Sequence, residues 1–292
     1  MKEGLIYISL ELDLNPKIDL HTHSNASDGI LSPRSLVQYA VEHGLSGIAL
    51  TDHDTLAGIS EAECEASKIN NFIFVPGIEL STEYNNIEIH ILGYHINLND
   101  EIFRKKISII SDARTSRLNQ MVSKLQNIGI EFNSDTLNNL EKIKNPGRLH
   151  LARVLKNMKV VSTIDEAFQK YLSRGSPGYF PRFKLTPNEA IHLIRMANGI
   201  PVLAHPGLIK SDELVSYLMK YPFEGIEVYY PSHSKADIQK YTSIAQKHDL
   251  LITGGSDFHA PPESGIRNNS IGYCSVPISS ISKMIKKNNR LP

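Results

Sequence analysis

Apolar segments of strand length alternate with helical patterns near both ends of this sequence. The segment at 16–20 is followed by others at 47–50, 72–76, 87–92, 200–204, 225–229 and 250–254. Most of them precede a stretch with the apolar spacing of a helix, such as the one expected to begin at Ser32-Pro33, where serine caps and proline suits the first turn. About seven strands in this rhythm predict an α/β fold, a parallel barrel or a close relative.

The middle of the chain has a different pattern. Segments 100–127, 133–141, 147–158 and 163–174 have helical character, and no convincing strand lies between them. We therefore expect a helical insertion at 100–184 that caps the site, between a first barrel part at 17–99 and a second at 185–288.

Composition narrows the class of protein. The 31 basic and 31 acidic residues balance, which argues against a surface that binds nucleic acid everywhere. Cys64 and Cys274 form no close pair, so we expect reduced core thiols of a cytoplasmic protein. The first residues lack the features of a signal peptide, and no apolar run approaches the ~20 residues of a membrane span. Nothing in the sequence indicates an obligatory protein partner.

Histidines and carboxylates gather at the ends of the expected strands. The residues at these ends are His21, His23, His53, Glu79, His205, Asp257 and His259, and His90 lies within or near the end of its strand. Because chemistry in such barrels gathers at the C-terminal ends of the strands, we expect these side chains to converge. Of the twelve histidines, His43, His192 and His248 lie in helical stretches and receive no function, and His95 stays open.

The spacing of these residues indicates a metal site. Residues i and i+2 of an extended chain point to the same side, so His21 and His23 can reach one ion, and Asp257 and His259 repeat that spacing. The mixture of imidazoles and carboxylates exceeds what one tetrahedral zinc needs and suits Mn²⁺, Fe²⁺ or Zn²⁺. A carboxylate such as Glu79 can bridge two ions about 3.5–4 Å apart, the spacing used for attack on phosphorus.

Six short motifs resemble the PHP (polymerase and histidinol phosphatase) family. They are DLHTHSNASDG at 19–29, TDHDT at 51–55, GIEL at 77–80, HILGY at 90–94, AHP at 204–206 and GGSDFHA at 254–260, in the family's order. The match is closest to a stand-alone bacterial subgroup through GRLHLAR at 147–153, where Leu149 replaces the usual proline, and GIEVYYPSH at 225–233. The resemblance implies a distorted (β/α)₇ barrel and activity on a nucleotide 3′,5′-bisphosphate or the 5′ end of short RNA.

The resemblance also implies two or three divalent ions per chain, with Mn²⁺ favoured and Zn²⁺ or Fe²⁺ as alternatives. By motif match, the first ion would be held by His21, His23, Glu79 and Asp257, the second by Glu79, His90 and His205, and the third by Asp28, His53 and His259. Asp19, Asp52 and Asp54 would orient the imidazoles.

A basic segment indicates where a polyanionic substrate would lie. Residues 142–184 contain ten basic residues against two acidic ones, a balance of +8, whereas the remaining chain has 21 against 29, or −8. The arginine fork suits bidentate contact with phosphate. Arg148 and Arg182 follow Gly and Pro at junctions between segments, and His233 follows Tyr230-Pro231. We expect these three side chains to bind substrate.

The predicted reaction is hydrolysis of a phosphate ester. A hydroxide that bridges two ions attacks phosphorus, and Glu79, His205 and His259 are the expected catalytic residues. One alternative is a histidinol-phosphatase-like enzyme, although the basic segment suits a polyanion better. A second alternative is a metal-dependent amidohydrolase, but such an enzyme should have a carboxylated lysine or another strand-end motif, and we find neither in this sequence. A third alternative is a non-catalytic metal-binding accessory module, like the PHP domains attached to polymerases, which the complete ligand set disfavours.

Overall fold

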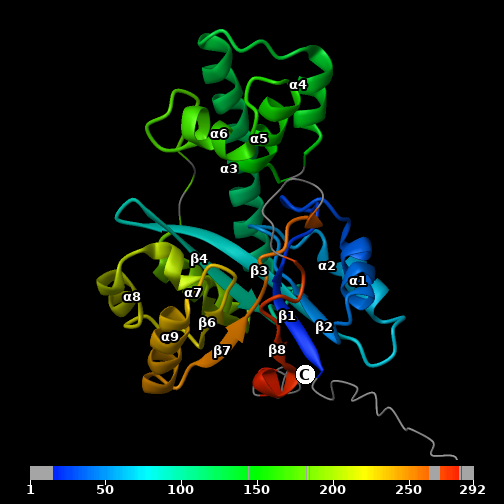
Figure 1. The fold of residues 1–292 in the computed structure, drawn as a ribbon, viewed down its shortest axis with the longest axis vertical. Coiled ribbons are helices and arrows are strands. Elements are labelled where there is room, and N and C mark those ends of the chain that lie inside the picture. The colour runs from blue at the N-terminus through cyan, green and yellow to red at the C-terminus, as the bar shows by residue number, and fades with distance from the viewer. Residues whose placement is uncertain are drawn as a thin grey trace, which may run out of the picture.

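One sheet of eight strands curls into a nearly closed barrel (Figure 1) in the computed structural model, which describes residues 16–143, 145–181, 183, 185–262, 270–282 and 284. The strands are β1 (Lys17–Thr22), β2 (Gly47–Leu50), β3 (Ile73–Tyr84), β4 (Ile87–Tyr94), β5 (Ile200–Leu203), β6 (Gly225–Tyr229), β7 (Leu251–Gly254) and β8 (Val276–Pro277). Their order in the sheet is β7-β6-β5-β4-β3-β2-β1-β8. The predicted distorted α/β barrel is therefore confirmed.

Two strands depart from the parallel arrangement. β4 pairs antiparallel with both β3 and β5, and the two-residue β8 pairs antiparallel with β1. The other neighbours pair in parallel. The barrel closes just after β7, where Phe258 forms a parallel bridge with Thr22 and its carbonyl accepts from the His23 amide at 2.9 Å. The closing contact thus joins two of the motifs that carry predicted metal ligands.

The barrel interior is a buried apolar cluster drawn from several strands. It includes Leu20, Val75, Tyr94 and Val202. The Tyr94 hydroxyl of β4 donates to the Leu20 carbonyl of β1 at 2.8 Å, which places the Tyr94 side chain across the barrel. This packed interior supports the strand ends on which the site is built.

Helices cover the outside of the barrel on two sides (Figure 1). They are α1 (Pro33–Glu42), α2 (Ile59–Ala66), α7 (Pro187–Met196), α8 (Asp212–Leu218) and α9 (Lys235–Lys247), with short 3₁₀ turns η2 (Pro206–Ile209) and η4 (Ile278–Ile281). The Ser32 hydroxyl accepts from the Ser35 amide as the cap of α1, as predicted. Thr186 and Glu189 form a capping box at α7, which fixes where that helix begins.

The middle of the chain forms helices that stand above one end of the barrel (Figure 1). They are α3 (Glu101–Asn127), α4 (Ser134–Glu141), α5 (Arg148–Asn157), α6 (Ile164–Ala167) and the π-helix η1 (Phe168–Leu172). Leu118, Leu125, Leu151 and Leu172 belong to a core cluster of their own, separate from those of the barrel. The predicted helical segments are confirmed, and we call α3 to η1 the insertion helices.

Two expectations about the bulk of the chain have different outcomes. Cys64 is exposed and Cys274 only partly buried, so the predicted core position is wrong for Cys64, which lies on an outer face of α2. Across the described residues, none of the helices combines the length and the hydropathy that crossing a membrane would require.

Candidate metal centre and active site

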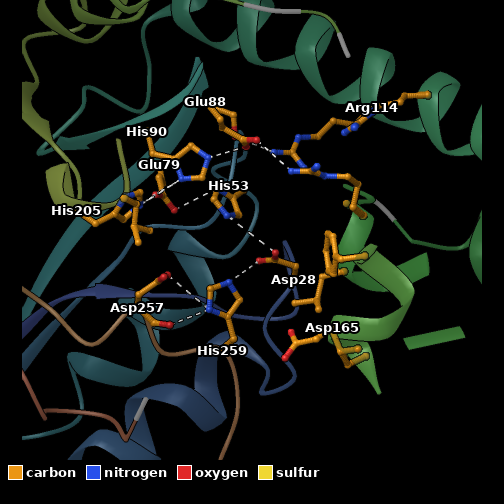
Figure 2. A pocket seen from close by; sticks show the side chains of 18 of the residues that line it. Asp28, His53, Glu79, Glu88, His90, Arg114, Asp165, His205, Asp257 and His259 are labelled. Carbon is orange, nitrogen blue, oxygen red and sulfur yellow. Dashed lines mark hydrogen bonds and ion pairs between the residues drawn. The ribbon is translucent and has the colours of Figure 1, made fainter. Parts of the chain in front are cut away.

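The nine predicted ligands converge at one end of the barrel, below the insertion helices. Figure 2 shows His53 and His259 directed toward Asp28, and His90 and His205 directed toward Glu79. His21 and His23 reach the same cluster from the end of β1. Side chains from the two barrel parts of the sequence therefore form one site.

Glu79 is the centre of this cluster and is 1% exposed. Its Oε1 lies 2.8 Å from His90 Nδ1 and 3.0 Å from His205 Nε2. Its Oε2 lies 3.1 to 3.2 Å from ring nitrogens of His21, His23 and His53. Burial alone would raise the pKa of this carboxyl, but His53, His21 and His90 around it hold that pKa well below its usual range. One carboxylate thus offers an oxygen to each of two groups of imidazoles, as a bridging ligand does.

Three groups of ligand atoms lie close enough to hold an ion each. They are His21, His23, Glu79 and Asp257; His53, Glu79 and His90; and His23, Asp28, His53 and His259. The first group matches the predicted first set. The other two share His53, and His205 joins the second through contacts of 3.0 Å to Glu79 and 3.3 Å to His90 Nδ1.

The chemistry of these groups fits divalent cations. Within the described part of the chain, several buried ligand atoms form no hydrogen bond, which is costly unless a cation satisfies them. These atoms are His21 Nε2, His53 Nδ1, Glu79 Oε2 and both ring nitrogens of His23. Burial would lower the pKa of His23, but the nearby carboxylates of Asp257 and Glu79 raise it to about 10. Burial lowers the pKa of His53 to about 3, which keeps its imidazole neutral, as metal ligation requires.

Glu79 was predicted to lie at the end of its strand, and this prediction is wrong. Glu79 and His90 both lie within their strands. β3 continues five residues beyond Glu79, and its antiparallel partner β4 places His90 opposite Ser81. The paired ends of β3 and β4 extend past the other strands (Figure 1). The ligands are therefore level with the barrel rim even though their own strands run on.

Asp19 and Asp52 were predicted to orient the imidazoles directly, and this needs correction. Their hydrogen bonds go to backbone amides and serine hydroxyls of the loops near the histidines. Asp19 accepts from the amides of His21, Ser256 and Gly272 at 3.2, 3.0 and 2.8 Å. Asp52 accepts from Ser24 and from Ser27 Oγ at 2.6 to 2.7 Å. Both carboxylates fix the loops, and the loops in turn place the imidazoles.

Glu227 is the orienting carboxylate that the sequence reading missed. It is fully buried on β6, and its Oε1 lies 3.0 Å from His21 Nδ1. Its Oε2 accepts from the His205 amide at 2.7 Å. His205 has a φ of 24°, in a region that costs free energy for a residue other than glycine. Glu227 therefore fixes the tautomer of one candidate ligand and the strained backbone of another. Its signal was a lone acid in the apolar run GIEVY.

The insertion helices also hold the loops that carry two ligands. Arg153 of α5 donates to the Asp28 carbonyl at 2.7 Å, and the Asn145 amide donates to the His53 carbonyl. Arg114 of α3 binds Asp54 through Nε at 2.8 Å and through a second nitrogen. These three contacts reach one side of the cluster, where Asp28 and His53 lie.

A cavity of about 770 Å³ joins the cluster to the insertion helices. Its lining includes Glu79, His205 and His259 on the barrel side and Arg114, Arg117 and Arg148 on the other. The Arg148 guanidinium lies 3.0 Å from Glu88, which in turn contacts His90 Nε2 at 2.9 Å. Sequence reasoning missed Arg114 and Arg117, whose spacing of three residues on one helix places both on the same face.

His233, another predicted substrate residue, does not line this cavity. His233 is 8% exposed, and its ring nitrogens contact the Val228 carbonyl at 2.9 Å and the Gly207 amide at 3.1 Å. Because both nitrogens are used inside the barrel, His233 has no donor left for a substrate. Arg182 lies outside the described residues.

Comparisons with known proteins agree with this geometry. A family model described as the PHP domain matches residues 19–176. The chain belongs to the PHP family. The 5′-3′ exoribonuclease Rnm of Escherichia coli is 33% identical over 83% of this chain and 85% of its own. The 3′,5′-nucleoside bisphosphate phosphatase of Chromobacterium violaceum is 34% identical over 85% of this chain and 89% of its own.

A solved structure from Bifidobacterium adolescentis, assigned as a metal-dependent phosphoesterase, resembles this PHP protein closely. It has a TM-score of 0.83 at 28% identity and covers 92% of this chain and 96% of its own. With the family, these relatives and a cluster of side chains able to bind metals, the chain is a metal-dependent phosphoesterase.

Proposed function

We propose that this PHP enzyme hydrolyses the phosphate ester of a nucleotide 3′,5′-bisphosphate, or the 5′ end of a short RNA. The observation that carries the proposal is the single cavity that links Glu79 to the arginines of the insertion helices. A cavity of this size suits a nucleotide. One phosphate would lie at the metal centre and a second at Arg148, whose side chain is 26% exposed. The names of the two relatives support the same substrate class.

The metal centre proposed here has two or three ions, with Mn²⁺ first and Zn²⁺ or Fe²⁺ as alternatives. His21, His23, Glu79 and Asp257 would hold the first ion, Glu79, His90 and His205 the second, and Asp28, His53 and His259 the third. Bound divalent ions would lower the pKa of the attacking water and neutralise charge on the phosphoryl oxygens.

The side chains of the protein would position the ions and the substrate. Glu79 keeps its charge between two groups of imidazoles and so fixes their spacing. His205 and His259 line the cavity, and their catalytic role would be to hold the second and third ions, whose charge would stabilise the leaving oxygen. Arg148 would hold the phosphate that does not react. Residues 100–184 would act as the cap over the barrel parts 17–99 and 185–288.

The test is phosphate release from a set of substrates with Mn²⁺ added. We expect hydrolysis of adenosine 3′,5′-bisphosphate or of short 5′-phosphorylated RNA, with weaker hydrolysis of histidinol phosphate. A preference for histidinol phosphate would favour the small-molecule phosphatase instead. No hydrolysis of any ester by metal-loaded, folded protein would favour the non-catalytic module.

A further inference from the structure

The insertion side of the cavity has an apolar wall, separate from the metal ligands. The wall consists of Leu149, Ile164 and Phe168, which all line the cavity. Each is half-buried, and Ile164 and Phe168 pack on one side against the core of the insertion helices. Figure 2 shows the α6 side of the cavity, marked by Asp165. Apolar surface left open inside a polar cavity favours a ligand with an apolar face.

Phe168 lies where the helix changes its winding. α6 is a single turn that begins after the Thr163 cap, and Phe168 is the first residue of the π-helix η1. Single π turns inside helices are rare and often occur at functional sites. Among the described residues that line the cavity, Phe168 has the only aromatic ring other than histidine.

A cation lies over this ring. The Arg148 guanidinium carbon is 5.6 Å from the Phe168 ring centroid, and its NH2 group lies 3.0 Å from Glu88 Oε2. Glu88 contacts His90, which contacts Glu79. The Phe168 ring, the Arg148 guanidinium and the metal ligands therefore follow one another across the cavity. A bound nucleotide would place its base, its second phosphate and its reacting phosphate at these three groups in the same order.

We propose that Phe168, with Leu149 and Ile164 beside it, binds the nucleobase of the substrate by stacking. This inference rests on the proposed function, because it requires a nucleotide at the metal centre. Every base has a face on which an aromatic ring can stack, whereas the three wall residues have no side-chain hydrogen-bonding groups. The wall therefore recognises the presence of a base, and it supplies selectivity for nucleotides over simple phosphate esters.

The test compares a nucleotide with a matched analogue that has no base. Phe168→Ala should lower kcat/KM for adenosine 3′,5′-bisphosphate about ten- to a hundredfold. It should leave the abasic ribose bisphosphate analogue and p-nitrophenyl phosphate within about twofold of wild type. Phe168→Leu keeps the packing without the ring and should fall in between, and Phe168→Tyr should restore activity. Phe183→Ala, an exposed phenylalanine away from the cavity lining, is the control.

A second readout measures stacking without turnover. A 2-aminopurine nucleoside bisphosphate should lose fluorescence on binding the wild type, and Phe168→Leu should remove most of that quenching. Equal losses of kcat/KM on the nucleotide and the abasic analogue, or unchanged quenching, would overturn the inference while the proposed function stands. Failure of the wild type to hydrolyse any nucleotide or RNA end would overturn both.

Discussion

Glu227 links two candidate metal positions through one carboxylate. It contacts His21 Nδ1 at 3.0 Å and the His205 amide at 2.7 Å. Glu227→Gln keeps the size but replaces one acceptor by a donor, so it opposes the tautomer that leaves His21 Nε2 free to ligate. We expect about ten- to a hundredfold weaker binding of Mn²⁺ in calorimetric titration. Glu224→Gln, three residues earlier and outside the site, is the control, and matched affinities in the two variants would exclude this role.

We expect His95 to make the stability of the fold depend on pH. It is 7% exposed, both ring nitrogens lack a partner in the described structure, and burial lowers its pKa to about 4. The unfolded chain has a His pKa of about 6.5 and binds the proton more tightly. The contribution of neutral His95 to the free energy of unfolding is therefore fully present above about pH 6.5. Up to about 3 kcal/mol of that free energy is lost as the pH falls toward about 4.

His95→Asn tests that assignment, because asparagine does not titrate and tolerates the φ of 53° at this position. Urea unfolding of chelator-treated wild type and variant at pH 7 and pH 4.5 gives the comparison, since the metal ligands titrate equally in both. The variant should lose less stability on acidification. Parallel losses in the two proteins would show that His95 does not cause the pH dependence.

At the scale of elements, the insertion helices and the barrel jointly position the candidate metal ligands. Arg153 of α5 holds the Asp28 carbonyl and Asn145 holds the His53 carbonyl. Arg153→Ala should therefore weaken the binding of one ion by roughly tenfold and leave the binding of the others unchanged. Lys156→Ala removes the same charge from the same helix and should not change metal titration. If the two variants titrate alike, the insertion does not support the centre.

The sequence predicted the elements better than their pairing. Strand and helix periods are local properties, so the α/β rhythm and the helical middle segment could be read directly. The direction in which β4 pairs depends on its neighbours in the sheet, which an apolar run does not encode. The long extension of β3 was hidden because its last residues, STEY, have no strong apolar pattern.

The candidate site divides in the same way. His21, His23, Asp257 and His259 could be predicted from i, i+2 spacing and motif order. Glu227 and Arg153 act through partners far away in sequence, and only the fold brings those partners together. His233 was predicted to bind substrate, but it does not line the cavity. Its ring nitrogens contact the Val228 carbonyl and the Gly207 amide, and the sequence alone does not reveal these partners.

For the whole molecule, the number of bound ions is the simplest prediction. Nine candidate ligands form three overlapping groups, so elemental analysis after reconstitution with Mn²⁺ should give two or three ions per chain. Glu79→Gln removes the carboxylate that faces both sides of the cluster and should reduce that number. A single ion in the wild type would contradict the multinuclear arrangement.

The central claim is that one cavity combines a phosphoesterase centre with recognition of a second phosphate. Arg148→Ala removes a charge-assisted contact of about 1.5–3 kcal/mol. The decisive measurement is kcat/KM of this variant on adenosine 3′,5′-bisphosphate and on p-nitrophenyl phosphate, with Arg174→Ala, an insertion arginine outside the cavity lining, as control. A loss of about ten- to a hundredfold confined to the bisphosphate is predicted. Equal losses on both substrates, or none on either, would contradict the account.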